Sequence, residues 1–314
     1  MPDGRAVGGS TYGAGAEAGS PAPSGAPLAG RVCVVTGANR GLGRATALGL
    51  ARLGATVVML ARDARLGAAA RDDVSRESGN ARVSLVTIDL ASLASVRAAA
   101  SEIASRFPAV HVLVNNAGVN PTRRAVSADG VELTFAVNHL GPFLLTNALL
   151  PLLRRGASDT GDARVVTVTS LFERFGRIAF DDLQHARRWI GLFAYTQSKL
   201  ANVLFTYELA ARLAGSGVTA TCVSPGLVAT DLMRDWPLFR PRPLRALWRQ
   251  VLLTPEDGAA AAVRAASVPE LAGVTGQCFD RHGRPVRTSR RSYDVAARER
   301  LWRVSEELTT SGRH

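Results

Sequence analysis

Short apolar runs alternate with amphipathic stretches along most of the chain. Largely apolar runs of strand length occupy residues 32–35, 56–60, 83–88, 110–114, 164–169, 218–223 and 276–279. Apolar residues at helical spacing occupy residues 44–53, 65–78, 92–106, 131–150 and 194–213, and Pro142 predicts a kink in the fourth of these helices. The alternation predicts the α/β fold class, with a single doubly wound Rossmann-type domain whose mostly parallel central sheet is flanked by helices.

The first residues of the chain do not follow this pattern. Residues 1–29 are rich in Gly, Ala, Ser and Pro and lack the apolar core of a signal peptide, so we expect a disordered tail. The domain is expected to occupy residues 30–309. No run of 18 or more apolar residues occurs, so no membrane-spanning helix is predicted.

The chain is basic, with 38 Lys and Arg residues against 26 Asp and Glu residues and a formal net charge of +12. Two arginine clusters, at residues 234–249 and 281–291, lack the aromatic platform or groove-reading motif of a nucleic-acid module. We therefore expect solvated faces and no nucleic-acid partner. Cys33, Cys222 and Cys278 form no C-x-x-C motif, which argues against a disulfide framework or a metal site and favours a reducing, cytoplasmic location.

A glycine-rich turn follows the first predicted strand. It reads Thr36-Gly37-Ala38-Asn39-Arg40-Gly41-Leu42-Gly43 and precedes a helix and a second strand. The spacing is G-x-x-x-G-x-G rather than G-x-G-x-x-G. Such a strand–turn–helix unit places backbone N–H groups and a helix N-terminus against a pyrophosphate, so the turn predicts a dinucleotide site.

The end of the second strand indicates which dinucleotide is bound. The strand ends at Ala61 with no carboxylate before Arg62, and Arg40 in the glycine turn can reach the same place. Two guanidinium groups favour the 2′-phosphate of NADP(H) over NAD(H). Asp63, immediately after Arg62, keeps the alternative open.

Tyr195 and Lys199 lie four residues apart in the helix predicted at residues 194–213, and Lys199 is the only lysine of the chain. At this spacing the two side chains share one face of the helix. An ammonium near a phenol is expected to lower the pKa of the phenol and make Tyr195 a general acid/base. A chance pair at this common spacing is the alternative, which only the rest of the chain can exclude.

Four ordered motifs make the chain similar to the short-chain dehydrogenase/reductase family. They are the glycine turn at residues 36–43, Asn115-Asn116-Ala117-Gly118, Ser170 and Tyr195-x-x-x-Lys199. Residues 135–141, 198–205 and 301–306, with the long gap between Ser170 and Tyr195, resemble the retinol-dehydrogenase-like branch that includes the WW-domain oxidoreductase. The resemblance covers about residues 30 to 309.

The resemblance implies a role for each matching residue. Tyr195 would transfer a proton to or from the substrate oxygen, Lys199 would assist it and bind the nicotinamide ribose, and Ser170 would hydrogen-bond the substrate oxygen. Asn138 would anchor a water molecule that connects Lys199 to solvent. The implied cofactor-binding residues are Gly37, Asn39, Arg40, Gly41, Leu42, Gly43, Arg62, Asp89, Leu90, Asn116, Ala117, Gly118, Tyr195, Lys199, Pro225, Gly226, Val228 and Thr230.

Two residues near these motifs have competing interpretations. Thr169 offers a hydroxyl beside Ser170 where relatives usually show two serines, but adjacent strand residues point to opposite faces, so we assign Ser170 to the site. His139 follows Asn138 and is expected to be a packed or solvent-facing helix residue rather than a catalyst.

The segment at residues 232–253 combines Trp236, Phe239 and Trp248 with three prolines and several arginines. A regular buried helix is excluded in its first half, so we expect a substrate lid over a hydrophobic carbonyl or alcohol. Peripheral contact with a membrane is an alternative for this segment. The sequence identifies neither the substrate nor the oligomeric state.

Three functions therefore compete. The first is an NADP(H)-dependent oxidoreductase that transfers a hydride between nicotinamide and a hydrophobic carbonyl or alcohol. The second is a non-catalytic NADP-sensing or scaffold protein that retains the fold, against which the complete Ser170, Tyr195 and Lys199 set argues. The third, a basic protein that binds nucleic acid or anionic membrane, has no motif to support it.

Overall fold

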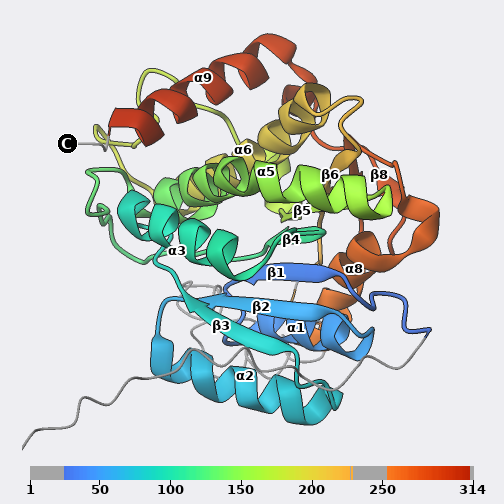
Figure 1. Cartoon of the computed structure of the whole chain (residues 1–314). Coiled ribbons are helices and arrows are strands. Elements are labelled where there is room, and N and C mark those ends of the chain that lie inside the picture. Colours follow the sequence, from blue (N-terminus) through green and yellow to red (C-terminus); the bar gives the residue numbers. More distant parts are fainter. Residues whose placement is uncertain (1–24, 227, 229–252, 312–314) are drawn as a thin grey trace, which may run out of the picture.

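An eight-stranded sheet crosses the computed structural model, which describes residues 25–226, 228 and 253–311 (Figure 1). The order is β3-β2-β1-β4-β5-β6-β7-β8, and all neighbours are parallel except β7 and β8. The strands are β1 (Val32–Thr36), β2 (Thr56–Ala61), β3 (Val83–Thr87), β4 (Val112–Asn115), β5 (Ala163–Val168), β6 (Val218–Val223), β7 (Gln277–Phe279) and β8 (Pro285–Val286). The predicted Rossmann-type fold with a mostly parallel sheet is confirmed.

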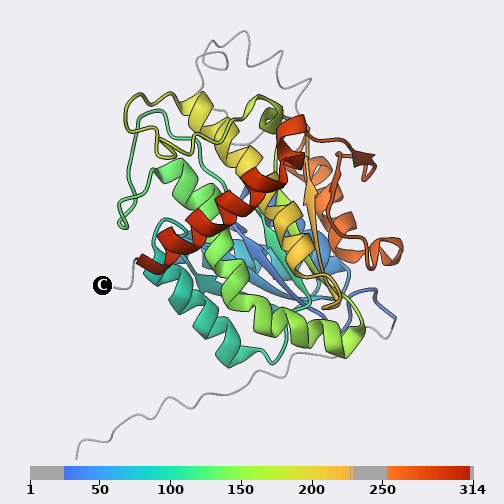
Figure 2. The same ribbon diagram turned by 90° about the horizontal axis from the view of Figure 1, so that it is seen from above.

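Helices cover both faces of the sheet (Figures 1 and 2). One face carries α1 (Gly41–Arg52), α2 (Ala64–Ser78) and α8 (Pro255–Ser267). The other carries α3 (Leu93–Arg106), α5 (Gly141–Thr160) and α6 (Gly191–Arg212), with α9 (Val295–Ser311) packed on α6. Short helical turns lie at η2 (Leu171–Phe175), η5 (Pro269–Leu271) and η6 (Arg290–Tyr293).

The strands in the middle of the sheet, such as β1 and β4, are mostly apolar and fully buried because both of their faces are covered. Val34 and Leu113 belong to the core cluster under α3, α5 and α6, whereas Cys33 and Val112, their neighbours in sequence, belong to the cluster under α1, α2 and α8. This double burial is what the continuous apolar runs predict for a parallel sheet. It fixes the carboxyl ends of β1, β4, β5 and β6 along one edge.

The helical stretch around Asn138 is longer and less regular than the sequence predicts. It consists of α4 (Leu133–Phe135), a π-helical turn η1 (Ala136–Leu140) and α5, which continues through Pro151 instead of ending at residue 150. Pro142 lies in the first turn of α5, directly after the π turn, in which the Gly141 N–H donates to the carbonyl of Ala136. The irregularity is thus a π turn that contains Asn138.

The same stretch is the one part of the described chain that is long and apolar enough to cross a membrane. Its mean hydropathy is 1.3, and 72% of the relevant window is buried inside the fold. Packing against the sheet accounts for this apolar character, as it does in the core helices of many domains.

The domain begins slightly earlier than the sequence predicts. Leu28, assigned to the tail, is 2% exposed, and its N–H donates to the carbonyl of Leu53 at 2.9 Å. Leu28 therefore packs in the core beneath α1. Residues 1–24 of the predicted tail lie outside the described residues.

Candidate active site

The turn between β1 and α1 approaches its surroundings so closely that only glycine fits. Gly37 and Gly41 have φ angles of +64° and +52°, in the left-handed region. A Cβ at Gly43 would lie 2.2 Å from the carbonyl oxygen of Gly37 and 2.4 Å from Nδ2 of Asn116. Arg40, at the N-cap of α1, supplies no side-chain hydrogen bond to the first turn. The first N–H groups of α1 are therefore suited to a phosphate ligand.

Thr36 joins this turn to the loop after β4. Its hydroxyl oxygen accepts hydrogen bonds from the N–H groups of Asn116 at 2.9 Å and Ala117 at 3.0 Å. The Asn116 amide in turn donates to the carbonyl of Thr36 at 2.8 Å. The glycine turn and the predicted Asn116–Gly118 segment are thus held side by side, as one surface.

Asn138 fixes the end of the same loop. Its Oδ1 accepts from the N–H of Val119 at 2.7 Å, and its Nδ2 donates to the Val119 carbonyl and to Oγ of Ser198, both at 3.0 Å. A Cβ added at Gly118 would lie 3.6 Å from Nζ of Lys199. The glycine therefore leaves the space beside the Lys199 ammonium open to a ligand. Asn138 acts here as a clamp between the β4 loop and α6; its predicted water-anchoring role stays a prediction.

The ends of β2 and β3 carry the predicted adenosine contacts. Arg62 is exposed, whereas the Asp63 carboxylate caps α2 by accepting the N–H of Leu66 at 2.9 Å. Asp89 accepts the N–H of Ala91 at 2.9 Å, which shapes the turn after β3. Leu90, also predicted to contact the cofactor, follows Asp89 and is buried. The two other predicted cofactor residues, Asn39 and Leu42, lie in the turn between β1 and α1 and at the start of α1.

The predicted catalytic residues meet where β5 ends against α6. Ser170 and Tyr195 share a hydrogen bond, and the Lys199 ammonium lies 5.7 Å from the centre of the Tyr195 ring. Lys199 Nζ donates to the carbonyl of Val168 at 3.2 Å, while the Thr169 hydroxyl donates to the backbone carbonyl of Lys199 at 2.9 Å. Thr169 is therefore engaged in holding α6, which supports Ser170 as the hydroxyl of the site.

The protonation of this pair differs from the expectation. Burial raises the pKa of the Tyr195 phenol to about 12, although the hydrogen bond from Ser170 acts in the opposite direction. Burial also lowers the pKa of the Lys199 ammonium to about 8. The predicted lowering of the Tyr195 pKa is thus wrong for this structure, because desolvation outweighs the hydrogen bond from Ser170. Near neutral pH Tyr195 carries a proton to donate.

His139 is packed in the core, which is one of the two placements expected for it. It is buried among the rings of Phe135, Phe143 and Phe205, and its Nε2 lies 2.8 Å from Oγ of Ser305. Burial lowers the pKa of its imidazole to about 3. A neutral, enclosed imidazole of this kind serves packing rather than proton transfer.

The end of β6 closes the site on its other side. Gly226 has a φ angle of +81°, and the buried Val228 forms an isolated parallel bridge with Leu253. Pro225 precedes this turn, next to Ser224, whose N–H donates to the carbonyl of Phe279 at 2.8 Å. Thr230 and residues 232–252 of the predicted lid lie outside the described residues.

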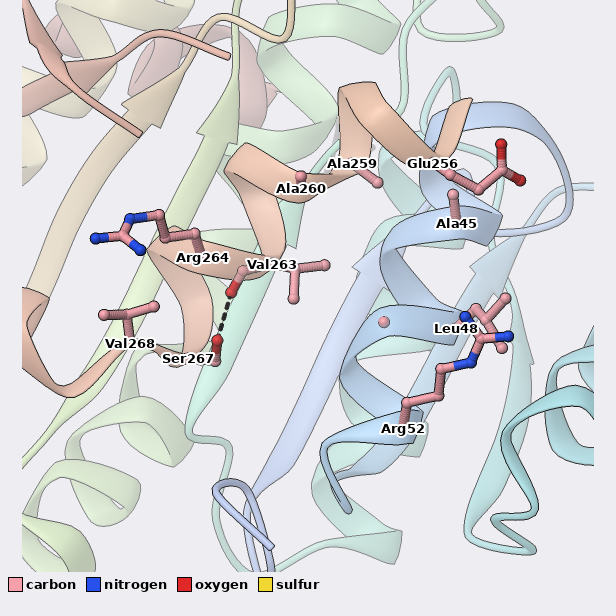
Figure 3. Close-up of a pocket in the computed structure, with 11 residues that line it drawn as sticks. Ala45, Leu48, Arg52, Glu256, Ala259, Ala260, Val263, Arg264, Ser267 and Val268 are labelled. Carbon is pink, nitrogen blue, oxygen red and sulfur yellow. Dashed lines mark hydrogen bonds between the residues drawn. The ribbon is translucent and has the colours of Figure 1, made fainter. Parts of the chain in front are cut away.

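Two cavities differ in their relation to these residues. One, of about 340 Å³, is lined by Ser170, by Gly226 and by residues of η2 and the β7–β8 hairpin. The other, of about 380 Å³, lies between α1 and α8, where Arg52, Glu256 and Arg264 surround alanine and valine side chains (Figure 3). Only the first, which we call the Ser170 cavity, adjoins the catalytic residues.

A nicotinamide dinucleotide fits these residues on structural grounds. Gly43 leaves the space that a side chain would fill, the N-terminus of α1 lacks a side-chain cap, and the approach to Lys199 past Gly118 is kept open by a glycine. The phosphates would be held at the glycine turn, the ribose at Lys199 and the nicotinamide end near Gly226. No group of three or more metal-ligating side chains occurs among the residues that the structure describes.

The comparison with known proteins agrees with this geometry. The short chain dehydrogenase family profile matches residues 31–240. Retinol dehydrogenase 12 of Mus musculus is 40% identical over 286 residues, covering 90% of this chain and 87% of that protein. A structure from Mycobacterium paratuberculosis has a TM-score of 0.72, with 38% identity over 90% of this chain and 94% of that one. The RhlG/NADP active-site complex of Pseudomonas aeruginosa has a TM-score of 0.66. It is 28% identical to this chain, and the match covers 81% of this chain and 95% of that one.

The chain therefore belongs to the short-chain dehydrogenase/reductase family, and it is an oxidoreductase that acts on alcohol or carbonyl groups. The resemblance to retinol dehydrogenases that the sequence motifs indicated is confirmed.

Sequence analysis missed several residues that organise the site. Thr36 connects the glycine turn to the β4 loop, and Ser198 connects Asn138 to α6. Both residues lie inside motifs described above, so their positions could have indicated a role in the site. A threonine and a serine give no such indication by residue type alone. Glu173 and Ser224, which line the Ser170 cavity, gave no pattern at all, because their importance depends on burial.

Proposed function

We propose that this protein is an NADP(H)-dependent oxidoreductase that transfers a hydride between nicotinamide and a carbonyl or alcohol of a hydrophobic small molecule. The observation that carries the proposal is the meeting of Ser170, Tyr195 and Lys199 beside a glycine turn suited to a dinucleotide. Similarity to retinol dehydrogenase 12 and to an NADP-bound structure supports it.

The side chains have distinct tasks in this reaction. A bound cofactor supplies the hydride in the reductive direction. Ser170 hydrogen-bonds the carbonyl oxygen, and Tyr195 donates its phenolic proton to that oxygen as negative charge develops there. The phenolate that remains is next to the ammonium of Lys199, whose positive charge stabilises it. In the oxidative direction the same groups act in reverse.

The preference for NADP(H) is supported at the end of β2. Asp63, the acid that could hold a ribose 2′-hydroxyl, caps α2 instead, whereas Arg62 is exposed beside it. Arg40, also exposed, lies in the adjacent turn. A 2′-phosphate would gain charge-assisted hydrogen bonds from both guanidinium groups.

A hydrophobic substrate is supported by the surface beside Tyr195. Leu171 and Phe175 of η2 are 50% and 75% exposed, and Leu192 and Phe193 at the start of α6 are 41% and 55% exposed. Large apolar side chains are seldom grouped on a surface unless they contact a ligand, a partner or a membrane. Here they flank the proton donor, which favours a ligand.

An assay of NADPH oxidation with a panel of aliphatic and cyclic aldehydes and ketones tests the proposal. We expect turnover that increases with the apolar surface of the carbonyl compound. Tight NADPH binding without turnover of any carbonyl, and without oxidation of the corresponding alcohols by NADP⁺, would support a non-catalytic NADP-binding protein instead.

A further inference from the structure

The Ser170 cavity has a polar floor that the reaction at Tyr195 does not use. Its buried polar lining includes Thr169, Ser170, Glu173 and Ser224. The Thr169 hydroxyl donates a hydrogen bond to the Lys199 carbonyl, and the Ser170 side chain is hydrogen-bonded to Tyr195. Glu173 Oε2 and Ser224 Oγ, in contrast, have no hydrogen-bond partner among the described residues.

Glu173 is held close to the reacting group by the backbone. Its N–H donates to the carbonyl of Ser170 at 3.0 Å, so the two residues are one 3₁₀ turn apart, roughly 6 Å along the chain axis. Its Oε1 accepts the N–H of Ser289 at 2.9 Å, which fixes the carboxylate while leaving Oε2 unpartnered. The side chain is 3% exposed. A buried carboxylate oxygen without a partner is costly, so a ligand donor there would be strongly favoured.

Ser224 supplies the complementary group. It ends β6 directly before Pro225 and is 6% exposed, and its hydroxyl can donate as well as accept. A ligand hydroxyl that contacted both side chains would donate to Glu173 and accept from Ser224.

The guanidinium groups of the cavity do not change this assignment. Arg174, Arg281 and Arg287 also line it, but all three are exposed at its rim. Arg174 donates to the carbonyl of Arg287 at 2.7 Å, and Arg281 donates to His282 Nε2 at 2.9 Å. Asp280, the other carboxylate of the lining, accepts the N–H groups of the β7–β8 turn. The unpartnered acceptor at the floor is Glu173.

We propose that the substrate carries a second, free hydroxyl group near its reacting carbonyl, and that Glu173 and Ser224 bind this hydroxyl and determine specificity. The inference rests on the proposed function, and it narrows the substrate from hydrophobic carbonyls in general to hydroxylated ones with an apolar skeleton. A cavity of about 340 Å³ accommodates a ring or short chain of this kind.

Four cyclic ketones test the proposal with the full-length protein and NADPH: cyclohexanone, 4-hydroxycyclohexanone, 4-methoxycyclohexanone and 4-oxocyclohexanecarboxylate. The expected result is a kcat/KM for the hydroxy ketone about tenfold or more above that of its methoxy analogue, which lacks the donor. In Glu173→Gln the amide oxygen is expected to keep the hydrogen bond from the Ser289 N–H, which places the NH₂ group at the position of Oε2. This group cannot accept a hydrogen bond from the ligand hydroxyl, so the ratio should fall to about one. Asp280→Asn, a matched removal of charge in the same cavity, should keep the wild-type ratio.

Binding to Tyr195→Phe with NADPH, measured by calorimetry, separates this inference from the proposed function. If no ketone is reduced by the wild type but the hydroxy ketone still binds in preference to the methoxy ketone, the proposed function fails and this inference stands. Equal ratios in wild type and Glu173→Gln, with a lower Tm for the variant, would assign Glu173 only to anchoring Ser289 and overturn the inference. Preference for the carboxylate probe would also overturn it and assign the arginine rim to an anionic substrate.

Discussion

The hydroxyl of Thr169 donates a hydrogen bond to the backbone carbonyl of Lys199, 2.9 Å away. Lys199 returns the contact through its ammonium, which donates to the carbonyl of Val168 at 3.2 Å. These two hydrogen bonds join the end of β5 to the third turn of α6. Ser170 directly follows Thr169, and Tyr195 lies one helical turn before Lys199 on α6; the two side chains share a hydrogen bond.

Removing the Thr169 hydroxyl should weaken this connection between β5 and α6. Thr169→Val is expected to lower the free energy of unfolding by about 1 kcal/mol, because a buried hydrogen bond is lost. Thr167→Val is a matched control, since the buried hydroxyl of Thr167 has no partner among the described residues. Urea unfolding followed by tryptophan fluorescence measures both variants. Equal stability losses in the two would show that the Thr169 bond contributes nothing of its own.

Lys199 should reduce stability even though catalysis needs it. Its pKa falls from 10.5 to about 8 on burial, so the folded protein holds the charged form at a cost below about pH 8. Lys199→Met should therefore raise the free energy of unfolding at neutral pH by about 1–3 kcal/mol while activity is lost. A variant less stable than the wild type would contradict this.

The same shift predicts a pH dependence for the difference in stability. Between about pH 8 and 10.5 the unfolded chain keeps the Lys199 proton that the folded protein releases, so wild-type stability gains relative to Lys199→Met as the pH rises. Unfolding curves of both proteins across this range measure the difference. A constant difference would show that the pKa of Lys199 is not lowered.

Activity should fall on the alkaline side. Tyr195, with a pKa of about 12, keeps its proton throughout, whereas Lys199 loses its charge as the pH passes about 8. We therefore expect kcat/KM for carbonyl reduction to be level below this pH and to decline above it. Rates from about pH 6 to about 10 at fixed ionic strength test this. A rate that keeps rising to the top of the range would contradict it.

Cofactor choice should depend on Arg40 and Arg62. Replacing both with Gln is expected to lower the ratio of kcat/KM for NADPH to that for NADH by about tenfold or more, because two charge-assisted bonds are lost. Arg65→Gln, three residues further on and also exposed, controls for the change of charge. Equal kcat/KM for both cofactors in the unmodified protein would contradict the proposed preference.

The sequence predicted the parts of the fold that repeat a simple pattern. The continuous apolar run at residues 32–35 indicates a strand buried on both faces. The turn after it requires glycine, at Gly37 and Gly41 for their positive φ angles and at Gly43 for its close contacts, so its glycine spacing could be recognised in the sequence. The length of a helix was harder to predict from the sequence. Pro151 argues for an end at residue 150, but α5 continues because tertiary packing outweighs local propensity.

The chemistry of the site was only half predictable, because the pKa values depend on burial. Spacing brought Tyr195 and Lys199 to one face of α6, but their pKa shifts follow from desolvation, which a sequence does not display. Glu173 could not be recognised as a site residue either, because its role depends on its burial and a glutamate outside a helix or strand is usually solvated.

In the proposed reaction Tyr195 donates the proton to the substrate oxygen. NADPH oxidation with the most reactive carbonyl of the panel, compared between wild type and Tyr195→Phe, tests it most directly. Phenylalanine keeps the ring that packs edge-on against Phe172, with centroids 6.1 Å apart, so folding and NADPH affinity should be retained. We predict a fall in kcat of about 10²-fold or more. A variant that keeps most of the wild-type kcat would contradict the account.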